Sequence, residues 1–192
     1  MLMGGFSYTA GMEKKLDPSH LDVVAFARDG ASLKGQSPLA ALPRLLDEQV
    51  AGDLQAGLVA WRLEGRLVPQ SGGADQIWLD VQASVALPMQ CQRCLTPVLE
   101  TVEAERSFRF VADEATAATL DDEAEEDILV ISRDFDALAL VEDELILSLP
   151  LVPLHEVCPQ AMPMSAVDPE FETAAVKPNP FGVLAGLKTG KS

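Results

Sequence analysis

The chain of 192 residues carries 14 Lys and Arg against 30 Asp and Glu, a formal net charge of −16, and 48% of its residues are hydrophobic. This length fits one ordinary domain, or one domain with a tail, and excludes most two-domain enzymes. With so many acidic residues, the chain lacks the basic surface typical of nucleic-acid-binding proteins, and its net charge repels phosphate backbones at long range.

The first fifty residues predict a strand followed by a helix. Residues 22–27 (DVVAFA) have the composition of a short strand. Residues 42–50 predict a helix with Pro43 in its first turn, Leu45 and Leu46 facing inward, and Gly52 past its end.

Three longer strand-like runs follow, at residues 58–68, 76–87 and 97–111. Apolar and polar residues alternate most clearly in the second and third runs, which is typical of strands with one buried face. The first two runs are joined by the turn-forming stretch PQSGGAD. The second and third are joined by PMQCQRCLTP, so the CxxC motif is expected at the tip of a hairpin.

The next part of the chain begins with an acidic segment. Residues 112–127 carry eight acidic residues and no basic residue, so we expect a solvated loop or a disordered insert. Residues 128–131 (ILVI) predict a buried strand. Asp134 is then expected to cap a helix that runs to Leu149 and ends at Pro150.

These elements predict an α+β fold, an antiparallel β-sheet with a few flanking helices and a mostly irregular C-terminal tail. We expect a single domain over residues 1–155 with its acidic insert at 112–127. The Pro-rich tail is expected over residues 156–192 and contains an apolar motif near its end.

The sequence predicts no transmembrane helix. The longest nearly apolar run, residues 145–154, contains two prolines and is well short of the roughly 20 residues that cross a bilayer. The first fifteen residues have their charges after a weak apolar stretch, the reverse of a secretory signal. We therefore expect a cytoplasmic protein with no membrane partner, in which reduced cysteines serve metal or redox chemistry.

Cys91, Cys94, His155 and Cys158 form the strongest candidate site. They make two pairs of ligands, each pair three residues apart, and together supply the Cys3His set of a structural zinc site. We therefore predict zinc as a cofactor. Two alternatives stay open. The cysteines could be ordinary hairpin residues, with His155 capping the preceding helix. Cys91 and Cys94 could also form a redox dithiol, although thioredoxin-like sites place the CxxC motif at the start of a helix. Arg93 would lower the thiol pKa values and help to bind a metal or a partner carboxylate.

The acidic residues suggest a second kind of site. Between residues 110 and 150 there are thirteen acidic residues and one basic residue, and this segment includes Glu142, Asp143 and Glu144. Runs as dense as this are usually solvated faces. They also suit a basic protein partner, so the three residues are candidates for partner binding.

The tail contains a third candidate site. Phe181, Val183, Leu184 and Leu187 are spaced as on one side of a short helix, with Asn179 as its cap. Because so short a helix is marginal alone, it should dock on a partner or on the chain's own sheet, and we favour a partner.

Motifs that would identify a common enzyme class are absent. The sequence contains no phosphate-binding loop, dinucleotide-binding glycine motif, nucleophile elbow or HExxH. We expect no enzyme and no small-molecule substrate. The alternative is a thiol- or metal-dependent enzyme that uses Cys91 and Cys94, which would require a pocket around the two thiols.

Three segments in order resemble the YceD family, also called the large ribosomal RNA subunit accumulation protein: residues 91–95 (CQRCL), 142–155 (EDELILSLPLVPLH) and 179–188 (NPFGVLAGLK). The resemblance implies a non-enzymatic factor needed for accumulation of 23S ribosomal RNA, acting in its synthesis, processing or stability. It also implies a large-subunit ribosomal precursor as the partner, through either its RNA or a basic ribosomal protein. The matching positions are Cys91, Arg93, Cys94, His155 and the acidic residues 142–144.

Overall fold

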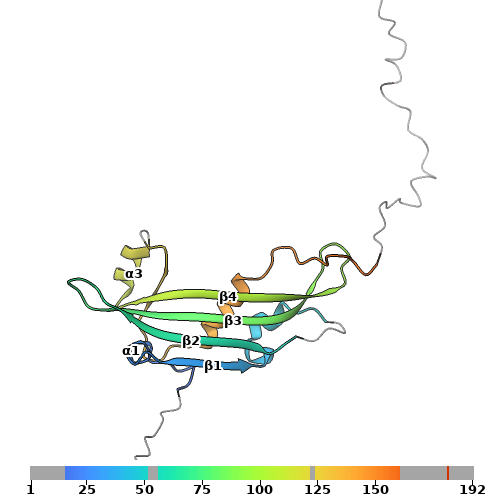
Figure 1. The fold of residues 1–192 in the computed structure, drawn as a ribbon. Coiled ribbons are helices and arrows are strands. Elements are labelled where there is room, and N and C mark those ends of the chain that lie inside the picture. The colour runs from blue at the N-terminus through green and yellow to red at the C-terminus, as the bar shows by residue number, and fades with distance from the viewer. Residues whose placement is uncertain (1–15, 52–55, 122–123, 161–180, 182–192) are drawn as a thin grey trace, which may run out of the picture. The chain divides into compact units, whose positions relative to one another are not determined.

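The computed structural model describes residues 16–51, 56–121, 124–160 and 181. The chain divides into two compact units, residues 1–157 and 158–192, and the fold described here is that of the first unit. Its centre is a five-stranded sheet in the order β1-β2-β3-β4-β5 (Figure 1). The strands are β1 (Ser32–Ser37), β2 (Val59–Val68), β3 (Gln76–Gln90), β4 (Pro97–Val111) and β5 (Asp127–Val130).

The first four strands are antiparallel neighbours, and β5 lies parallel to β4. A parallel neighbour needs a crossover, which the chain provides by passing through helix α3 (Glu114–Asp121) between the two strands. The prediction of an α+β fold with a mostly antiparallel sheet is confirmed. The three long strand predictions are confirmed as well, and β4 has the predicted bounds.

One face of the sheet carries the core. Every second residue of β3 from Leu79 to Leu87 is buried, as are Val102, Phe108 and Phe110 on β4. The face is covered by helices α1 (Val23–Arg28), α2 (Pro43–Asp47) and α4 (Ala137–Leu147). In Figure 1 the sheet is seen from its open face, with α4 behind β3 and β4. The alternation predicted from the sequence therefore identifies the buried face.

The predicted strand at residues 22–27 is wrong, because this segment forms α1. The Asp22 carboxylate caps the helix by accepting a hydrogen bond from the Ala25 N–H at 3.0 Å. Val23, Phe26 and Ala27 are then buried at helical spacing. The first strand is β1 instead, and its sequence SLKGQS has no apolar alternation by which it could be predicted.

The predicted helix at residues 42–50 is shorter than expected. A 3-10 helix η1 (Leu39–Ala41) precedes α2, which has Pro43 in its first turn as predicted and ends at Asp47. Leu45 is buried, whereas Leu46 is 38% exposed, so the prediction that both leucines face inward is half correct. Gly52 lies outside the described residues.

The acidic insert is not a loop throughout, since it contains α3. The Asp113 carboxylate accepts a hydrogen bond from the Thr116 N–H at 2.8 Å, and the alanines that follow favour a helix. The predicted cap of the next helix is also wrong. Asp136 caps α4 by accepting from the N–H groups of Leu138 and Ala139, and Asp134 pairs with His20 instead.

Among the described helices, we find none with the length and apolar character that a bilayer crossing requires.

Candidate metal centre

The β3–β4 hairpin ends in a tight turn that holds the CxxC motif. The Cys91 N–H donates to the Thr96 carbonyl at 3.0 Å, and the Leu95 N–H donates to the Cys91 carbonyl at 2.9 Å. Leu95 has a φ of 60°, a left-handed conformation that is uncommon for leucine. Together these contacts bend the backbone around the two cysteines, as a pair of ligands to one ion requires.

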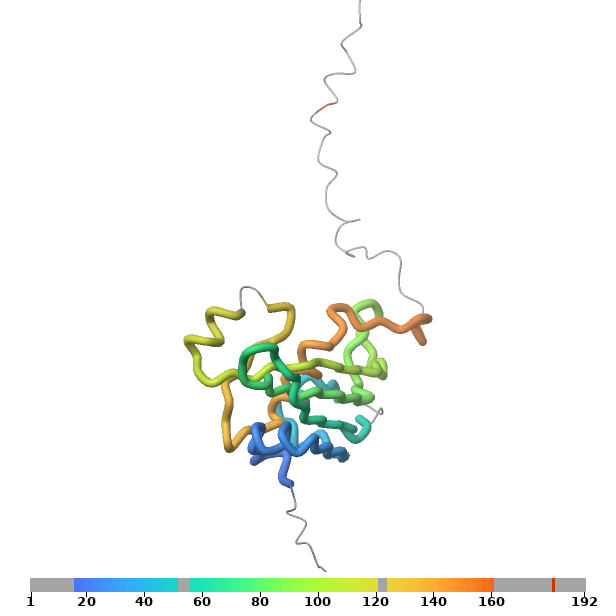
Figure 2. The backbone as a smooth tube through the Cα atoms, turned by 60° about the vertical axis from the view of Figure 1, so that its left-hand side comes forward, coloured from blue at the N-terminus to red at the C-terminus, as the bar shows by residue number. Residues whose placement is uncertain are grey.

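The second pair of candidate ligands comes from the segment that follows α4. This segment runs beside the hairpin tip (Figure 2), where the Gln92 N–H donates to the Pro153 carbonyl at 2.9 Å. The contact joins residues that are far apart in the sequence. It brings His155, two residues after Pro153, to the two cysteines of the hairpin.

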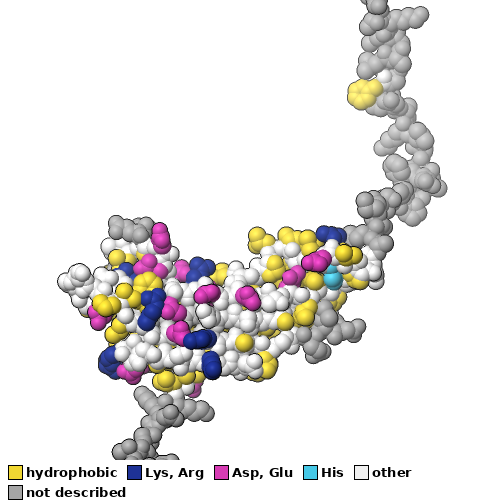
Figure 3. Space-filling view, viewed as in Figure 1, with side chains coloured by type: hydrophobic (Ala, Val, Ile, Leu, Met, Phe, Trp, Pro, Cys, Tyr) yellow, Lys and Arg dark blue, Asp and Glu magenta, His cyan; other side chains and the backbone are white. Residues whose placement is uncertain are grey.

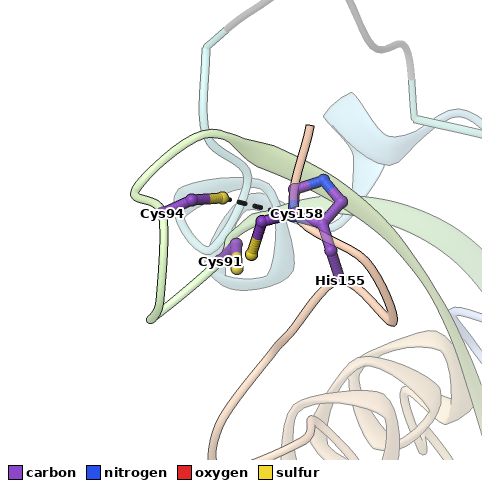
Figure 4. Close-up of side chains that lie close together, drawn as sticks. All are labelled: Cys91, Cys94, His155 and Cys158. Atoms are coloured by element: carbon purple, nitrogen blue, oxygen red, sulfur yellow. Dashed lines mark hydrogen bonds between the residues drawn. The ribbon is translucent and has the colours of Figure 1, made fainter. Parts of the chain in front are cut away.

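The four predicted ligand residues lie together in the structure (Figure 4). One ligand atom from each of Cys91, Cys94, His155 and Cys158 lies within 4.8 Å of the others, and Cys94 Sγ is 3.4 Å from His155 Nδ1. A tetrahedral zinc ion with Zn–S distances of about 2.3 Å would place its sulfur ligands about 3.8 Å apart. The cluster therefore needs only a small contraction to hold a metal ion.

The electrostatics favour the ligand form of Cys91. Cys91 is completely buried, and burial alone would raise the pKa of its thiol. The backbone N–H groups of Cys94, His155 and Arg93 and the His155 ring donate to the sulfur, however, and the pKa falls to about 5. The same thiolate raises the pKa of His155, so the ring must give up its proton when a metal binds. Metal ligation needs a thiolate, so the site stabilises the form of Cys91 that a metal binds.

Thr96 is a further member of the site that the sequence did not single out. Its hydroxyl lies 3.1 Å from Cys94 Sγ, and its carbonyl accepts from Cys91. A threonine two residues after a CxxC has no distinctive pattern, so only the folded turn reveals this contact. Arg93 lies exposed at the same tip.

The acidic residues 142–144 have different environments. The side chains of Glu142 and Glu144 are each 7% exposed, and they pair with Arg44 and Arg106 respectively. Burial raises the pKa of Glu144 even though Arg106 opposes this shift. Asp143 is 47% exposed and also pairs with Arg44. Of the three predicted partner-binding acids, Asp143 therefore presents the most side-chain surface to solvent.

The predicted apolar motif of the tail lies almost entirely outside the described residues. Phe181 is described and is 69% exposed, whereas Leu184 and Leu187 are not described.

Comparison with known proteins identifies the family. The family model described as "Large ribosomal RNA subunit accumulation protein YceD" matches residues 79–188, a segment that contains all four candidate ligand residues. A protein of that name from Haemophilus influenzae is 33% identical over 183 residues, which cover 92% of this chain and 99% of the relative. No solved structure matches the chain significantly. A match of this extent, through the hairpin and the segment after α4, means that the chain belongs to the YceD family.

Proposed function

We propose that this protein is a non-enzymatic factor that supports accumulation of the large-subunit ribosomal RNA. The observation that carries the proposal is the 33% identity to a protein of that name over nearly the full length of both chains. The factor would act in the cytoplasm, on the synthesis, processing or stability of 23S ribosomal RNA. It would do so by binding a component of the large-subunit precursor.

The metal centre has a structural role in this proposal. Three thiols and one imidazole complete a tetrahedron, which leaves no open position for a substrate, as in structural zinc sites. One zinc ion held by Cys91, Cys94, His155 and Cys158 would cross-link the hairpin tip to the segment after α4. That cross-link would fix the position of a short irregular segment, which hydrogen bonds alone would hold only weakly.

The site offers little to a thiol enzyme. A nucleophilic or redox thiol must be accessible to its substrate. Cys91 is completely buried, however, and Cys94 Sγ lies within hydrogen-bonding distance of Thr96 and His155. The low pKa of Cys91 is accounted for by its hydrogen bonds from the turn and from His155. A structural centre explains both features without a substrate.

The charge of the chain favours a basic protein as the direct partner. Residues 110–150 contribute a net charge of −12 to the total of −16, with thirteen acidic residues and one basic residue. Such a surface attracts a basic ribosomal protein and repels naked RNA at long range. Arg93, Asp143 and the tail motif with Phe181, Leu184 and Leu187 would add contacts, and the RNA would be reached through the bound protein.

The function is tested in cells from which the gene has been deleted. We expect the ratio of 23S to 16S ribosomal RNA to fall, and the wild-type gene to restore it. The tagged protein should also sediment with large-subunit precursors and lose them as salt rises, because the contact is electrostatic. An unchanged ratio in the deleted cells would contradict the proposal, and salt-independent association would contradict its electrostatic basis.

The metal is tested by elemental analysis of protein purified without chelator. We expect close to one zinc per chain, and a loss of zinc in His155→Ala. His20→Ala is the matched control because His20 is the other histidine of the chain and lies outside the centre. Metal-free protein with three freely titratable thiols would contradict the zinc assignment.

A further inference from the structure

A groove runs along the C-terminal half of α4. It consists of two adjoining cavities, of about 710 and 560 Å³, which share Glu48, Ile146 and Leu147 in their walls. The first cavity extends to β5 and the second to the segment around Pro150. We call the two cavities together the α4 groove.

The α4 groove exposes large apolar side chains. Leu147, which lines both cavities, is 73% exposed, and Leu151 in the second cavity is 99% exposed. Leu140 and Ile146 form part of the floor and are only partly buried. Figure 3 shows hydrophobic side chains gathered over the segment after α4 and the hairpin tip. Neighbouring exposed leucines of this kind are typical of a surface that another molecule covers.

The groove also has an excess of negative charge. The first cavity is lined by four carboxylates and two guanidinium groups, and the second by one carboxylate and no basic side chain. Both guanidinium groups already have partners, since Arg44 pairs with Asp143, and Arg106 pairs with Glu144 and Asp127. Glu48 lines both cavities and forms no ion pair within the described ranges.

Helix α4 adds to this potential. Its last turn contains no Lys or Arg, and residues 142–144 are all acidic. The C-terminal end of a helix carries a partial negative charge that basic residues normally offset. Here the helix end and the acidic side chains act in the same direction, so a positive charge from outside the chain is favoured beside the groove.

From this arrangement we infer that the α4 groove binds a basic amphipathic helix of a partner protein. Apolar side chains of that helix would pack on Leu147 and Leu151. Its Lys and Arg side chains would meet Glu48, and also Asp127, whose side chain is 56% exposed although it pairs with Arg106 at 3.6 Å. Helix α4 has 11 residues and is about 16 Å long, so roughly three turns of a partner helix can lie along it. The inference rests on the proposed function, because the partner is expected to be a component of the large-subunit precursor.

Two other occupants fit the groove less well. A nucleic acid would bring phosphates to a wall that has more carboxylates than guanidinium groups. A second copy related by two-fold symmetry would bring the same carboxylates face to face, in a chain with a net charge of −16. A basic helix complements both the charge and the apolar floor.

The groove is tested with the full-length protein and a fluorescent peptide of about 18 residues, made of lysine and leucine with the leucines on one helical face. We expect binding by anisotropy, weakening as salt rises. Leu147→Lys should weaken binding by about tenfold or more, and Glu48→Gln by severalfold. The matched controls are Leu58→Lys and Glu103→Gln, exposed positions outside the groove, and neither should change binding. Leu147→Met should bind like the wild type.

The inference is overturned if Leu147→Lys binds the peptide like the wild type, or if Leu58→Lys weakens binding equally. A wild-type dimer that Leu147→Lys dissociates would assign the groove to a second copy instead. RNA that competes with the peptide in the wild type but not in Leu147→Lys would assign it to nucleic acid. If the peptide does not bind the groove, but the gene still restores 23S ribosomal RNA in deleted cells, the inference about the groove fails and the proposed function stands. If peptide binding holds but deletion leaves the RNA unchanged, the proposed function fails alone.

Discussion

The Glu142 carboxylate on α4 caps the first turn of α2 by binding Arg44, a residue 98 positions earlier in the chain. Its Oε1 accepts from the Arg44 N–H at 2.7 Å and from the Leu45 N–H at 3.1 Å, and its Oε2 accepts from Arg44 Nε at 3.0 Å. The first N–H groups of a helix have no partner within the helix, and α2 has no side-chain cap of its own. Glu142 therefore satisfies donors that would otherwise be left unpaired near the core.

Replacing Glu142 should destabilise the fold. Glu142→Ala leaves two backbone donors and the Nε–H of Arg44 without their acceptor, and we expect a loss of about 2–4 kcal/mol in the free energy of unfolding. Asp143→Ala is the matched control, because Asp143 is half exposed and also pairs with Arg44, and it should cost less than about 1 kcal/mol. Urea denaturation measures both values. Equal losses would contradict the capping role.

Gly65 on β2 allows α1 to pack closely on the sheet. A Cβ added at this position would lie 2.6 Å from the Phe26 ring and 2.8 Å from the Ala27 backbone. Because the helix backbone cannot give way easily, Gly65→Ala should cost roughly 1–3 kcal/mol. Gly73→Ala is the control, since the nearest atom to its added Cβ is Gln70 Cβ at 4.0 Å. A melting temperature that is unchanged in Gly65→Ala would show that α1 is free to shift.

His20 and Asp134 form a pH-dependent contact between the segment before α1 and the segment before α4. His20 Nδ1 lies 2.7 Å from Asp134 Oδ1, and this hydrogen bond raises the pKa of His20. A raised folded-state pKa means that the stabilisation is complete below the unfolded value of about 6.5 and is lost as pH rises through the folded value.

The contact can be measured by NMR titration of the His20 ring. We expect a pKa above about 6.5 in the wild type and a return toward that value in Asp134→Asn. The melting temperatures of the two proteins should differ more at about pH 5.5 than at about pH 9. His20→Ala assigns the resonance, because the chain has two histidines. A difference that grows with pH would contradict the sign of the effect.

Loss of the metal centre should loosen one segment and leave the sheet folded. Cys94→Ser removes one of the four candidate ligands that would hold the hairpin tip to His155, whereas the sheet is stabilised by its own core. In hydrogen exchange, amides of residues 154–158 should exchange faster in the variant, and those of β3 and β4 should change little. Thr96→Val is the control for the neighbouring hydrogen bond. Uniformly faster exchange would indicate that the centre stabilises the whole fold.

Deletion of the tail after Lys177 tests the apolar motif. The shortened protein should keep its melting temperature and lose its association with large-subunit precursors, because the motif is proposed to contact a partner. Leu184→Asp in the full chain should reproduce the loss, and Val176→Asp, outside the motif, should not. A large fall in melting temperature with association intact would mean that the motif belongs to the core.

Local patterns in the sequence determined the long antiparallel strands and the hairpin that carries the CxxC. Alternating apolar residues identify the buried face of β3 and β4, because side-chain direction in a strand depends only on position along it. The spacing of Cys91 and Cys94 likewise predicts a pair of ligands on one turn. These features need no distant residue to define them.

The tertiary structure decided the features that depend on a distant partner. Residues 22–27 have an apolar run too short to distinguish strand from helix, and the close approach of α1 to Gly65 belongs to the folded state. The acidic residues 142–144 look alike in the sequence, yet two of them are buried and pair with Arg44 and Arg106. His155 reaches the cysteines through the contact of Gln92 with Pro153. Long-range pairing of this kind leaves no local pattern, because each partner's environment is set by residues far away in the chain.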